Sequence, residues 1–148
     1  ALELDGVVLV EAFIAGLEIT VAVLDGEALP VVSIEPVGGW FDLDAKYTKG
    51  KTVYTVPAVI PDAVAQKAQA AAVAAYAHIG CSGLARADFI VPVGDDVDPI
   101  FLEINTLPGM TPTSLSPMAA GEVGMSFSQL CERILLGAHR MNAETERT

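Results

Sequence analysis

The amino-acid sequence predicts an α+β domain, in which antiparallel hairpins alternate with helices. Apolar runs at 19–24 and 28–34 flank Asp25-Gly26, a dipeptide that favours a tight hairpin turn. A second pair of apolar runs, 84–93 and 99–106, flanks a short Gly-Asp-Asp segment. Other segments place apolar residues at helical spacing. The chain of 148 residues is long enough for one such domain to bury a core.

The N-terminal third is expected to be rich in strands and to end in a long loop. Residues 7–10, 19–24 and 28–34 are short apolar runs typical of strands. Residues 37–50 are polar and aromatic without a regular period. Loops of this length are commonly functional, so we expect this one to contribute to a site.

Three helices are expected in the rest of the chain. The first begins at Pro61 and ends at Gly80, because glycine adopts the left-handed C-terminal cap readily. Ser116 opens a short second helix, and Ser126 with Gln129 forms a capping box for the third. The residues predicted to face inward are Val64, Ala68, Ala71, Ala75 and Ile79 of the first helix and Leu130, Ile134, Leu135 and Ala138 of the third.

Composition excludes several classes of partner. The net charge of −11, from 8 basic and 19 acidic residues, opposes binding to nucleic acid or to an anionic membrane. Hydrophobic residues make up 52% of the chain, yet no apolar run has the length of a membrane span. We expect the excess to pack on a partner domain, and the start at Ala1 to mark a piece of a longer polypeptide. Cys81 and Cys131 have no metal spacing and fit reduced thiols in the cytoplasm.

The second hairpin is predicted to carry a charged face. If Asp95-Asp96 is its two-residue turn, Asp88 lies opposite Glu103 and Arg86 lies opposite Asn105. All four side chains then share one face, because residues two apart in a strand point the same way. The opposite, apolar face is predicted to hold Ala87, Phe89, Val91, Leu102 and Ile104.

Two carboxylates directly opposite each other repel, so this face needs a positive partner. One interpretation is a divalent cation held by Asp88, Glu103 and Asn105 through hard oxygen ligands. The other interpretation is a salt-bridge ladder in which Arg86 pairs with both acids. Residue spacing alone supports the two interpretations about equally. The loop that follows, from Thr106 into a Thr/Ser-rich stretch, favours a magnesium–phosphate site, since a ladder gives no reason for it.

At this point the motifs resemble those of D-alanine–D-alanine ligases, which are ATP-grasp enzymes. The resemblance rests on Leu84-Ala-Arg-Ala-Asp88 and on Phe101-Leu-Glu-Ile-Asn-Thr-Leu-Pro-Gly-Met-Thr-Pro-Thr-Ser-Leu-Ser-Pro117. It extends to Val8-Leu-Val-Glu-Ala-Phe-Ile-Ala-Gly-Leu-Glu18, Asp44-Ala-Lys-Tyr47 and Gly124-Met-Ser-Phe-Ser-Gln-Leu130. The motifs cover nearly the whole chain in order, and their combination is specific.

The resemblance implies a fold and a reaction. The fold is the C-terminal ATP-grasp subdomain, an antiparallel sheet flanked by helices, over residues 1–148. In the family, ATP phosphorylates the carboxylate of one D-alanine, and the amine of a second D-alanine displaces the phosphate. The dipeptide product enters peptidoglycan synthesis. By the same resemblance the enzyme is cytoplasmic and a homodimer, and it needs two Mg²⁺ or Mn²⁺ ions.

The resemblance also implies roles for the second hairpin and its loop. Asp88, Glu103 and Asn105 match the metal ligands, and Arg86 with the Gly109 N–H group matches the donors that stabilise the oxyanion. Ser114 and Leu115 match the site for the carboxylate of the second D-alanine, just before a helix start.

Further roles fall on the N-terminal segment and on the long loop. Lys46 is expected to contact the terminal phosphate of ATP, and Tyr47 to close the second substrate pocket, as parts of a lid that excludes water. The residues that match the ATP-binding set are Glu11, Phe13, Ile14, Glu18, Lys46, Ile90 and Leu102. For most of these an ordinary core or surface role is the alternative that spacing alone would favour.

Parts of the family's active site are absent from the chain, so we expect it to be inactive in isolation. The family's N-terminal and central parts, which hold the first D-alanine and further ATP ligands, have no match here. Two alternatives stay open. One is a ligase that joins D-alanine to D-lactate or D-serine, although Tyr47 favours an amine nucleophile. The other is a noncatalytic nucleotide-binding domain, which the intact set of Arg86 and the three metal-ligand matches disfavours.

Overall fold

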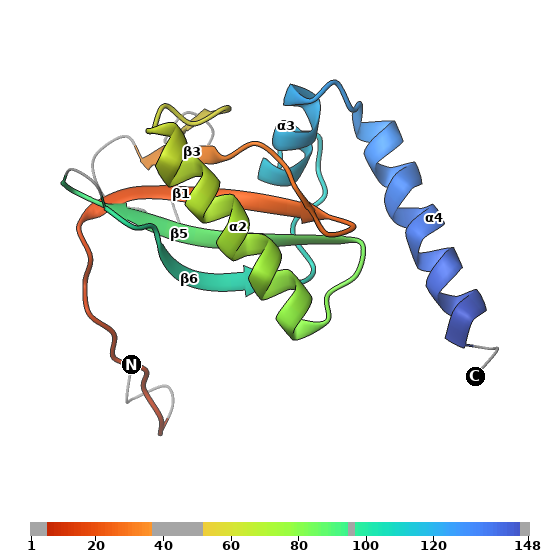
Figure 1. Ribbon diagram of the computed structural model, residues 1–148, viewed down its shortest axis with the longest axis horizontal. Coiled ribbons are helices and arrows are strands. Elements are labelled where there is room, and N and C mark those ends of the chain that lie inside the picture. Colours follow the sequence, from red (N-terminus) through yellow and green to blue (C-terminus); the bar gives the residue numbers. More distant parts are fainter. Residues whose placement is uncertain (1–5, 37–51, 95–96, 146–148) are drawn as a thin grey trace.

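The computed structural model describes residues 6–36, 52–94 and 97–145, with side chains of the last helix described as far as Ala138. Its centre is one antiparallel sheet with the strand order β4-β3-β1-β5-β6, and a short β2 that pairs with β1 (Figure 1). The predicted antiparallel sheet is therefore confirmed. The strands are β1 (Gly16–Leu24), β2 (Glu27–Ala28), β3 (Val32–Pro36), β4 (Thr52–Thr55), β5 (Leu84–Pro92) and β6 (Ile100–Asn105).

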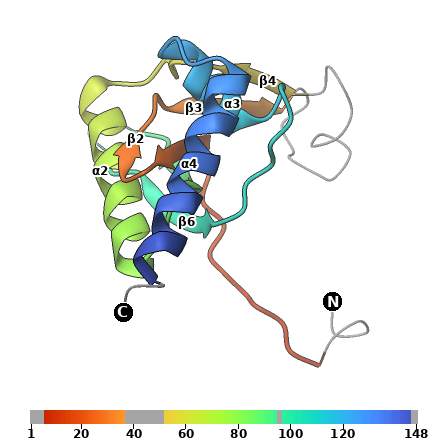
Figure 2. The same cartoon turned by 90° about the vertical axis from the view of Figure 1, so that its right-hand side faces the viewer.

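In the described residues three helices accompany the sheet: α2 (Asp62–Ile79), α3 (Leu115–Glu122) and α4 (Phe127–Thr145). Helix α2 runs along one face of the sheet, whereas α3 and α4 stand together at the end reached by the C-terminus of β1 (Figures 1 and 2). None of the helices in the described ranges is both long and apolar enough to cross a membrane. Within the described ranges, the three predicted helices are present in the predicted order.

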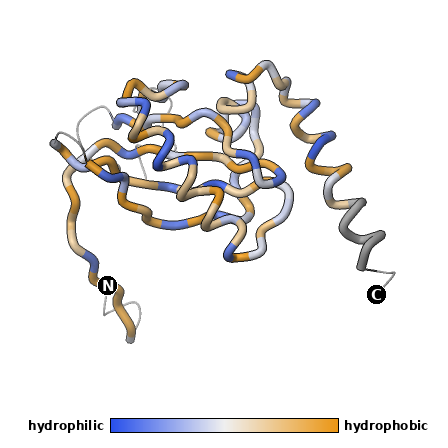
Figure 3. The backbone as a smooth tube through the Cα atoms, in the orientation of Figure 1, coloured by the Kyte–Doolittle hydropathy of each residue, from blue (hydrophilic) through white to orange (hydrophobic). Residues whose placement is uncertain are grey.

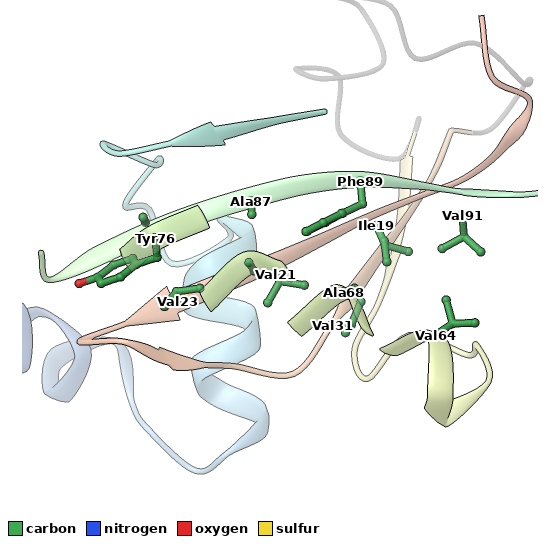
Figure 4. Close-up of a cluster of buried hydrophobic side chains, with 12 residues drawn as sticks. Ile19, Val21, Val23, Val31, Val64, Ala68, Tyr76, Ala87, Phe89 and Val91 are labelled. Atoms are coloured by element: carbon green, nitrogen blue, oxygen red, sulfur yellow. The ribbon is translucent and has the colours of Figure 1, made fainter. Parts of the chain in front are cut away.

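The face of the sheet under α2 holds the larger core. Ile19, Val21 and Val23 of β1 point to it, as do Ala87 and Phe89 of β5 (Figure 4). Alternate residues of a strand share a face, so the odd-numbered residues of both central strands are buried here. The side chains that α2 contributes are Val64, Ala68, Ala72 and Tyr76.

The predicted inward face of α2 is partly wrong. Val64 and Ala68 are buried as expected, and Ala71 packs partly buried against the same cluster. Ala72 and Tyr76 are the other buried positions, whereas Ile79 is 57% exposed. In an alanine-rich helix most positions are similarly apolar, so spacing alone does not select the face. The bulky ring of Tyr76 selects the buried face of the helix. Its apolar body is buried, while its hydroxyl donates to the Gly83 carbonyl at 3.1 Å.

The even-numbered residues of the central strands point to the opposite face, and only part of it is covered. Ala22, Leu24 and Leu84 pack in a second cluster with Ala119 and Ala120 of α3 and Leu130 of α4. The same face continues toward the far end of the sheet through polar residues outside that cluster. Those residues are Glu18, Thr20, Arg86 and Asp88. These four residues form what we call the polar half-face of the sheet, and the apolar half beside it is covered by α3 and α4.

Three of the predicted turns and caps are confirmed in detail. Asp25 (φ 52°) and Gly26 (φ 85°) both adopt the left-handed region that a tight hairpin turn of this type requires. Gly80 ends α2 with φ 73°. Before α4, the Ser126 N–H donates to Gln129 Oε1 at 2.8 Å and the Gln129 N–H donates to Ser126 Oγ at 3.3 Å. These two bonds are the predicted capping box.

Several strand predictions are wrong. Residues 7–10 are not a strand but belong to the N-terminal segment that leads away from the sheet (Figure 3). Their side chains are exposed, 80% or more for Val7, Leu9 and Val10. The run 28–34 is broken between β2 and β3, where Pro30 has no N–H group to give to a ladder. Strand β4 was not expected. It pairs with β3 along the edge of the sheet.

The inward face predicted for the last helix is also partly wrong. Leu130 is fully buried and Ile134 packs against the second cluster, as expected. Leu135 is 70% exposed, and Ala138 is exposed as well. The helix contacts α3, and its Arg133 also donates to the carboxylates of Asp25 at 3.0 Å and Glu27 at 3.3 Å at the β1–β2 hairpin, so a narrow apolar stripe suffices to hold it. The predicted loop at 37–50, with Lys46 and Tyr47, lies outside the described residues.

Candidate active site

The pairing of β5 with β6 has the predicted register. Asp88 lies opposite Glu103, and Arg86 lies opposite Asn105. Both pairs lie on the polar half-face, since Asp88 also lies opposite Thr20 of β1 and Arg86 opposite Ala22. The fold therefore brings together the four residues that the sequence placed on one face.

A β-bulge follows this pair and corrects the prediction for Leu102. Beyond Asp88 the register shifts, so that Phe89 lies opposite Phe101 rather than Leu102. Leu102 is the extra residue, and it is 44% exposed instead of being in the core. It lines the same pocket as Glu103, because a bulge places two successive residues opposite one. The bulge thus allows Leu102 to belong to the site.

A pocket of about 880 Å³ lies over this half-face. The strands and the Thr111–Ser114 segment line it, together with Glu11 from the N-terminal segment and Tyr54 from β4. The predicted site residues that it brings together are Glu11, Glu18, Arg86, Asp88, Leu102, Glu103, Asn105, Gly109, Ser114 and Leu115. Tyr54 was missed, because the strand that positions it was not predicted.

Arg86 and Asp88 form the strongest electrostatic contact in the pocket. Arg86 Nε donates to Asp88 Oδ1 at 2.9 Å, and Arg86 Nη2 donates to Asp88 Oδ2 at 2.7 Å. The two-point hydrogen bond to Asp88 raises the pKa of Arg86, with Glu103 and Glu18 adding smaller charge effects. The guanidinium is therefore a permanent cation in this pocket.

The salt-bridge ladder is only half formed. Within the described residues Arg86 pairs with Asp88, and no salt bridge joins it to Glu103. Glu103 is exposed on β6 and faces the same pocket. Glu103 lies opposite Asp88, and among the described side chains none forms a salt bridge with its carboxylate. The Arg86–Asp88 ion pair therefore leaves the negative charge of Glu103 in the pocket without a salt-bridge partner, and a further positive charge would stabilise it.

Thr20 is a second partner of Asp88 that the sequence reasoning missed. Its side chain is 1% exposed, and its hydroxyl donates to Asp88 Oδ1. The available signal was a lone hydroxyl in the apolar run Ile19-Thr-Val-Ala-Val-Leu24. That signal identifies a site only once the pairing of β1 with β5 is known.

The loop after β6 folds back so that Gly109 and Ser114 lie together. Asn105 Oδ1 accepts the Leu107 N–H at 2.9 Å, which turns the chain away from the strand. Ser114 Oγ accepts the Thr111 N–H at 3.0 Å and lies 2.8 Å from Thr111 Oγ1. A Cβ added to Gly109 would lie 3.3 Å from Ser114 Oγ. A polar loop thus lies beside the charged strands, at the start of α3.

A second pocket, of about 500 Å³, adjoins the first and shares Glu18 and Ile34 with it. It is more apolar, and the strand ends at Gly16 and Pro36 form part of its wall. The predicted ATP-binding residues in this pocket are Phe13, Ile14, Glu18 and Ile90. Glu11 lines the first pocket instead. The predicted residues therefore fall into an apolar compartment and a charged one that meet at Glu18.

The second pocket depends on Gly16, because β1 and β5 approach closely there. A Cβ added to Gly16 would lie 2.2 Å from the Val91 carbonyl oxygen and 2.8 Å from its carbon. Backbone must then move, so we expect Gly16→Ala to lower the free energy of unfolding by about 1–3 kcal/mol. Thermal or urea unfolding measures the loss. Gly6→Ala is the control, because nothing lies within 4 Å of the Cβ it would add, and equal stability of the two variants would contradict the prediction.

The polar half-face suits a hard divalent cation. Asp88, Glu103 and Asn105 supply two carboxylates and an amide oxygen on adjacent strands, which are the ligands such ions prefer. Among the described residues, no three His, Cys, Asp or Glu side chains gather around one point, so a cation site here needs the amide of Asn105. Asn105 Oδ1 keeps a second lone pair beyond the one used by Leu107. The donor set therefore fits the ion.

Comparison with known proteins agrees with this arrangement. The family described as "D-ala D-ala ligase C-terminus" matches residues 1–136. A D-alanine–D-alanine ligase from Syntrophotalea carbinolica is 52% identical over 134 residues, covering 90% of this chain and 43% of that protein. The chain spans less than half the length of the curated relatives it matches.

Solved structures give the same result. The D-alanine–D-alanine ligase of Bacillus anthracis complexed with ATP matches with a TM-score of 0.75 and 32% identity, over 90% of this chain and 41% of that one. The VanG D-Ala:D-Ser ligase of Enterococcus faecalis matches with a TM-score of 0.66 and 34% identity, over 83% of this chain and 36% of that one. With its fold, its motifs and these matches in agreement, the chain belongs to the family of D-alanine–D-alanine ligase C-terminal domains.

Proposed function

We propose that this chain is the catalytic C-terminal part of an ATP-dependent D-alanine–D-alanine ligase. The observation that carries the proposal is the register of β5 with β6, which sets Asp88 against Glu103 and Arg86 against Asn105. Acidic oxygens and a permanent cation then face one pocket beside a polar loop. Phosphoryl transfer to a carboxylate needs charge of both signs in one place, which this arrangement supplies.

The two pockets suit different parts of the nucleotide, the base in the apolar pocket and the phosphates in the charged one. The apolar pocket has walls suited to a base, formed by Phe13, Ile14 and Ile90. Glu18, at the junction of the pockets, would accept hydrogen bonds from ribose hydroxyls. Leu102, exposed by the bulge, would complete the wall on the phosphate side. Lys46 and Tyr47 remain predicted parts of the lid.

Asp88, Glu103 and Asn105 would hold two magnesium or manganese ions. When bound, such ions neutralise charge on the transferred phosphoryl group. The residues themselves contribute oxygens held at fixed positions on paired strands. Rigid strands suit this purpose, because a catalytic constellation needs its side chains positioned before substrate binds.

The remaining steps fall on Arg86 and the loop. In the proposed reaction the terminal phosphoryl group of ATP moves to the carboxylate of one D-alanine. The amine of the second attacks the acyl carbon, loses a proton, and phosphate leaves as the C–O bond breaks. Arg86 and the Gly109 N–H would stabilise the oxyanion formed between these events. Ser114 and the Leu115 N–H, at the start of α3, would hold the second carboxylate.

Other features of the proposal concern the intact enzyme. We infer that further domains of the same polypeptide hold the first D-alanine and the rest of the ATP. The family's homodimer and its cytoplasmic location belong to this proposal as well. The net charge of −11 continues to oppose nucleic acid as a partner.

The test is an assay of the intact polypeptide that contains this chain. With ATP, Mg²⁺ and D-alanine, we expect phosphate release that depends on D-alanine and yields the dipeptide. An intact enzyme that binds magnesium–ATP but releases no phosphate with any D-amino acid would refute the proposal in favour of a noncatalytic nucleotide-binding domain.

The isolated chain should not turn over. It spans 43% of the relative from Syntrophotalea carbinolica, and the proposal assigns the first D-alanine to the part beyond that match. We expect residues 1–148 alone to give no D-alanine-dependent phosphate release in the same assay. Release at a rate near that of the intact enzyme would show that the chain is self-sufficient.

The second substrate has one competing candidate supported by an observation. The fold also matches a D-Ala:D-Ser ligase with a TM-score of 0.66. The match to a D-alanine–D-alanine ligase has the higher TM-score of 0.75. Tyr47 favours an amine nucleophile, which opposes D-lactate but does not distinguish D-alanine from D-serine. Competition among D-alanine, D-serine and D-lactate as second substrates decides the matter, and we expect the D-alanine product to dominate.

A further inference from the structure

We propose that Thr20 is the positioning residue of this site: its buried hydroxyl occupies one oxygen of Asp88 and leaves the other to bind a cation. The inference rests on the proposed function, because it concerns the carboxylate assigned there to a metal. It adds a residue outside the motifs that identified the site. Thr20 is also absent from the described residues that line either pocket, so it acts only through Asp88.

The setting of Thr20 demands a partner for its hydroxyl. It lies at the middle of the central strand β1, 1% exposed, and its neighbours Ile19 and Val21 are fully buried. A buried hydroxyl without a hydrogen bond is costly, so its proton must go to an acceptor. Two acceptors are in reach, the Ala87 carbonyl at 3.2 Å and Asp88 Oδ1. The charged carboxylate is the stronger acceptor and the nearer one.

A count of lone pairs shows what this bond does to Asp88. A carboxylate offers about two acceptor sites on each oxygen. Oδ1 accepts from Thr20 and from Arg86 Nε, so both of its sites are filled. Oδ2 accepts from Arg86 Nη2 and retains one site. Asp88 therefore presents a single oxygen, Oδ2, to a cation.

Thr20 and Arg86 hold the carboxylate from different strands. Arg86 lies on β5 with Asp88, whereas Thr20 lies on β1 directly opposite it. In the proposed function Arg86 also contacts a reaction intermediate, so its guanidinium does not serve only to hold the Asp88 carboxylate in place. Thr20 is buried and does not contact the intermediate. Its hydroxyl therefore keeps the Asp88 carboxylate fixed while Arg86 interacts with the intermediate.

Thr20→Val tests the inference, because valine has the same shape without the hydroxyl. In the intact polypeptide that contains this chain, we expect the Mn²⁺ dissociation constant, measured by paramagnetic resonance with ADP present, to rise about 10- to 100-fold. Thr20→Ser keeps the hydroxyl and should restore binding to within about 3-fold. The turnover of Thr20→Val should recover as the Mg²⁺ concentration is raised, since the defect lies in occupancy.

Ser33→Ala is the matched control. Ser33 is 2% exposed and lies opposite Ile19, on the face covered by α2, so its loss removes a buried hydroxyl away from the site. We expect this variant to bind Mn²⁺ as the wild type does. Thermal unfolding of each variant verifies that the fold is kept.

The possible outcomes separate this inference from the function proposed above. Wild-type Mn²⁺ affinity in a folded Thr20→Val variant overturns the inference alone. Equal losses in Thr20→Val and Ser33→Ala also overturn it, because the effect would then be general. A wild-type protein that binds no Mn²⁺ with ADP overturns the proposed function and this inference with it.

Discussion

Glu103→Gln is expected to abolish phosphoryl transfer while leaving the fold intact. We expect turnover of the intact enzyme to fall at least about 10³-fold, which corresponds to about 4 kcal/mol of transition-state stabilisation. Glutamine has nearly the same shape but carries no charge. Glu103 is exposed in the pocket and holds no described hydrogen bond that the change would break.

Unlike its activity, the stability of the Glu103→Gln variant should not fall. Glu103 lies directly opposite Asp88, and like charges in facing positions of a sheet repel by a few tenths of a kcal/mol. Removing one of them should leave the melting temperature unchanged or slightly raised. Loss of activity with gain of stability is the signature of a residue kept for function rather than for folding.

The measurements are D-alanine-dependent phosphate release and thermal unfolding without ligand. Glu132→Gln, an exposed position on α4 outside both pockets, is the control and should change neither value appreciably. Near-normal turnover of Glu103→Gln would refute the metal assignment. A large drop in its melting temperature would mean that Glu103 has a structural role instead.

The register of the second hairpin was predictable because the period of a strand is two and its hydrophobic face must be buried. Together with an assumed two-residue turn at Asp95-Asp96, which lies outside the described residues, those constraints placed Asp88 opposite Glu103 and Arg86 opposite Asn105, as observed. Nearer to that turn the observed pairing differs from the predicted one by one residue. The bulge beyond Asp88 was not predictable. It inserts Leu102, an apolar residue in an apolar strand, and nothing in its type distinguishes the pocket side from the core side.

Local propensity failed where tertiary context decides. Residues 7–10 have strand-forming side chains but no strand pairs with them in the described chain. Strand propensity expresses the fit to a paired, half-buried surface, and in the described chain this run belongs to no strand and its side chains are exposed. The partner-domain surface expected from the 52% hydrophobic composition fits these exposed side chains.

The candidate site shows the same limit. Ten of the residues taken from motifs line one pocket, and their roles there stay predictions. Thr20 and Tyr54 have no motif. Each reaches the site through a strand pairing that joins distant parts of the chain, Thr20 with Asp88 and Tyr54 with Ile34. Contacts of that kind depend on the topology of the sheet rather than on any local pattern.

Arg86→Ala is expected to lose both activity and stability, for separable reasons. Turnover should fall about 10²- to 10³-fold, the usual effect of removing a donor aimed at a developing oxyanion. Magnesium–nucleotide binding should persist, because Asp88, Glu103 and Asn105 are untouched. Stability should fall by about 2 kcal/mol, since Asp88 is only 7% exposed and loses both hydrogen bonds from the guanidinium.

A cation should offset the loss of stability in this variant. Without Arg86, Asp88 and Glu103 face each other with only the Thr20 hydroxyl to help, so the affinity of this face for positive charge grows. We expect added Mn²⁺ to raise the melting temperature of Arg86→Ala more than that of the wild type. Turnover should stay low at any Mn²⁺ concentration, because a metal at Asp88 does not replace a donor at the oxyanion.

Lys67→Ala is the control for an ordinary ion pair. Lys67 Nζ lies 2.6 Å from Asp98 Oδ1, but the two side chains are 49% and 80% exposed, so the loss should be below about 1 kcal/mol. It should also be insensitive to Mn²⁺. If Arg86→Ala behaved like Lys67→Ala in both respects, the Arg86–Asp88 pair would be a surface salt bridge. A Mn²⁺-dependent recovery of stability without recovery of turnover would instead assign the acids to the metal and the guanidinium to the chemistry.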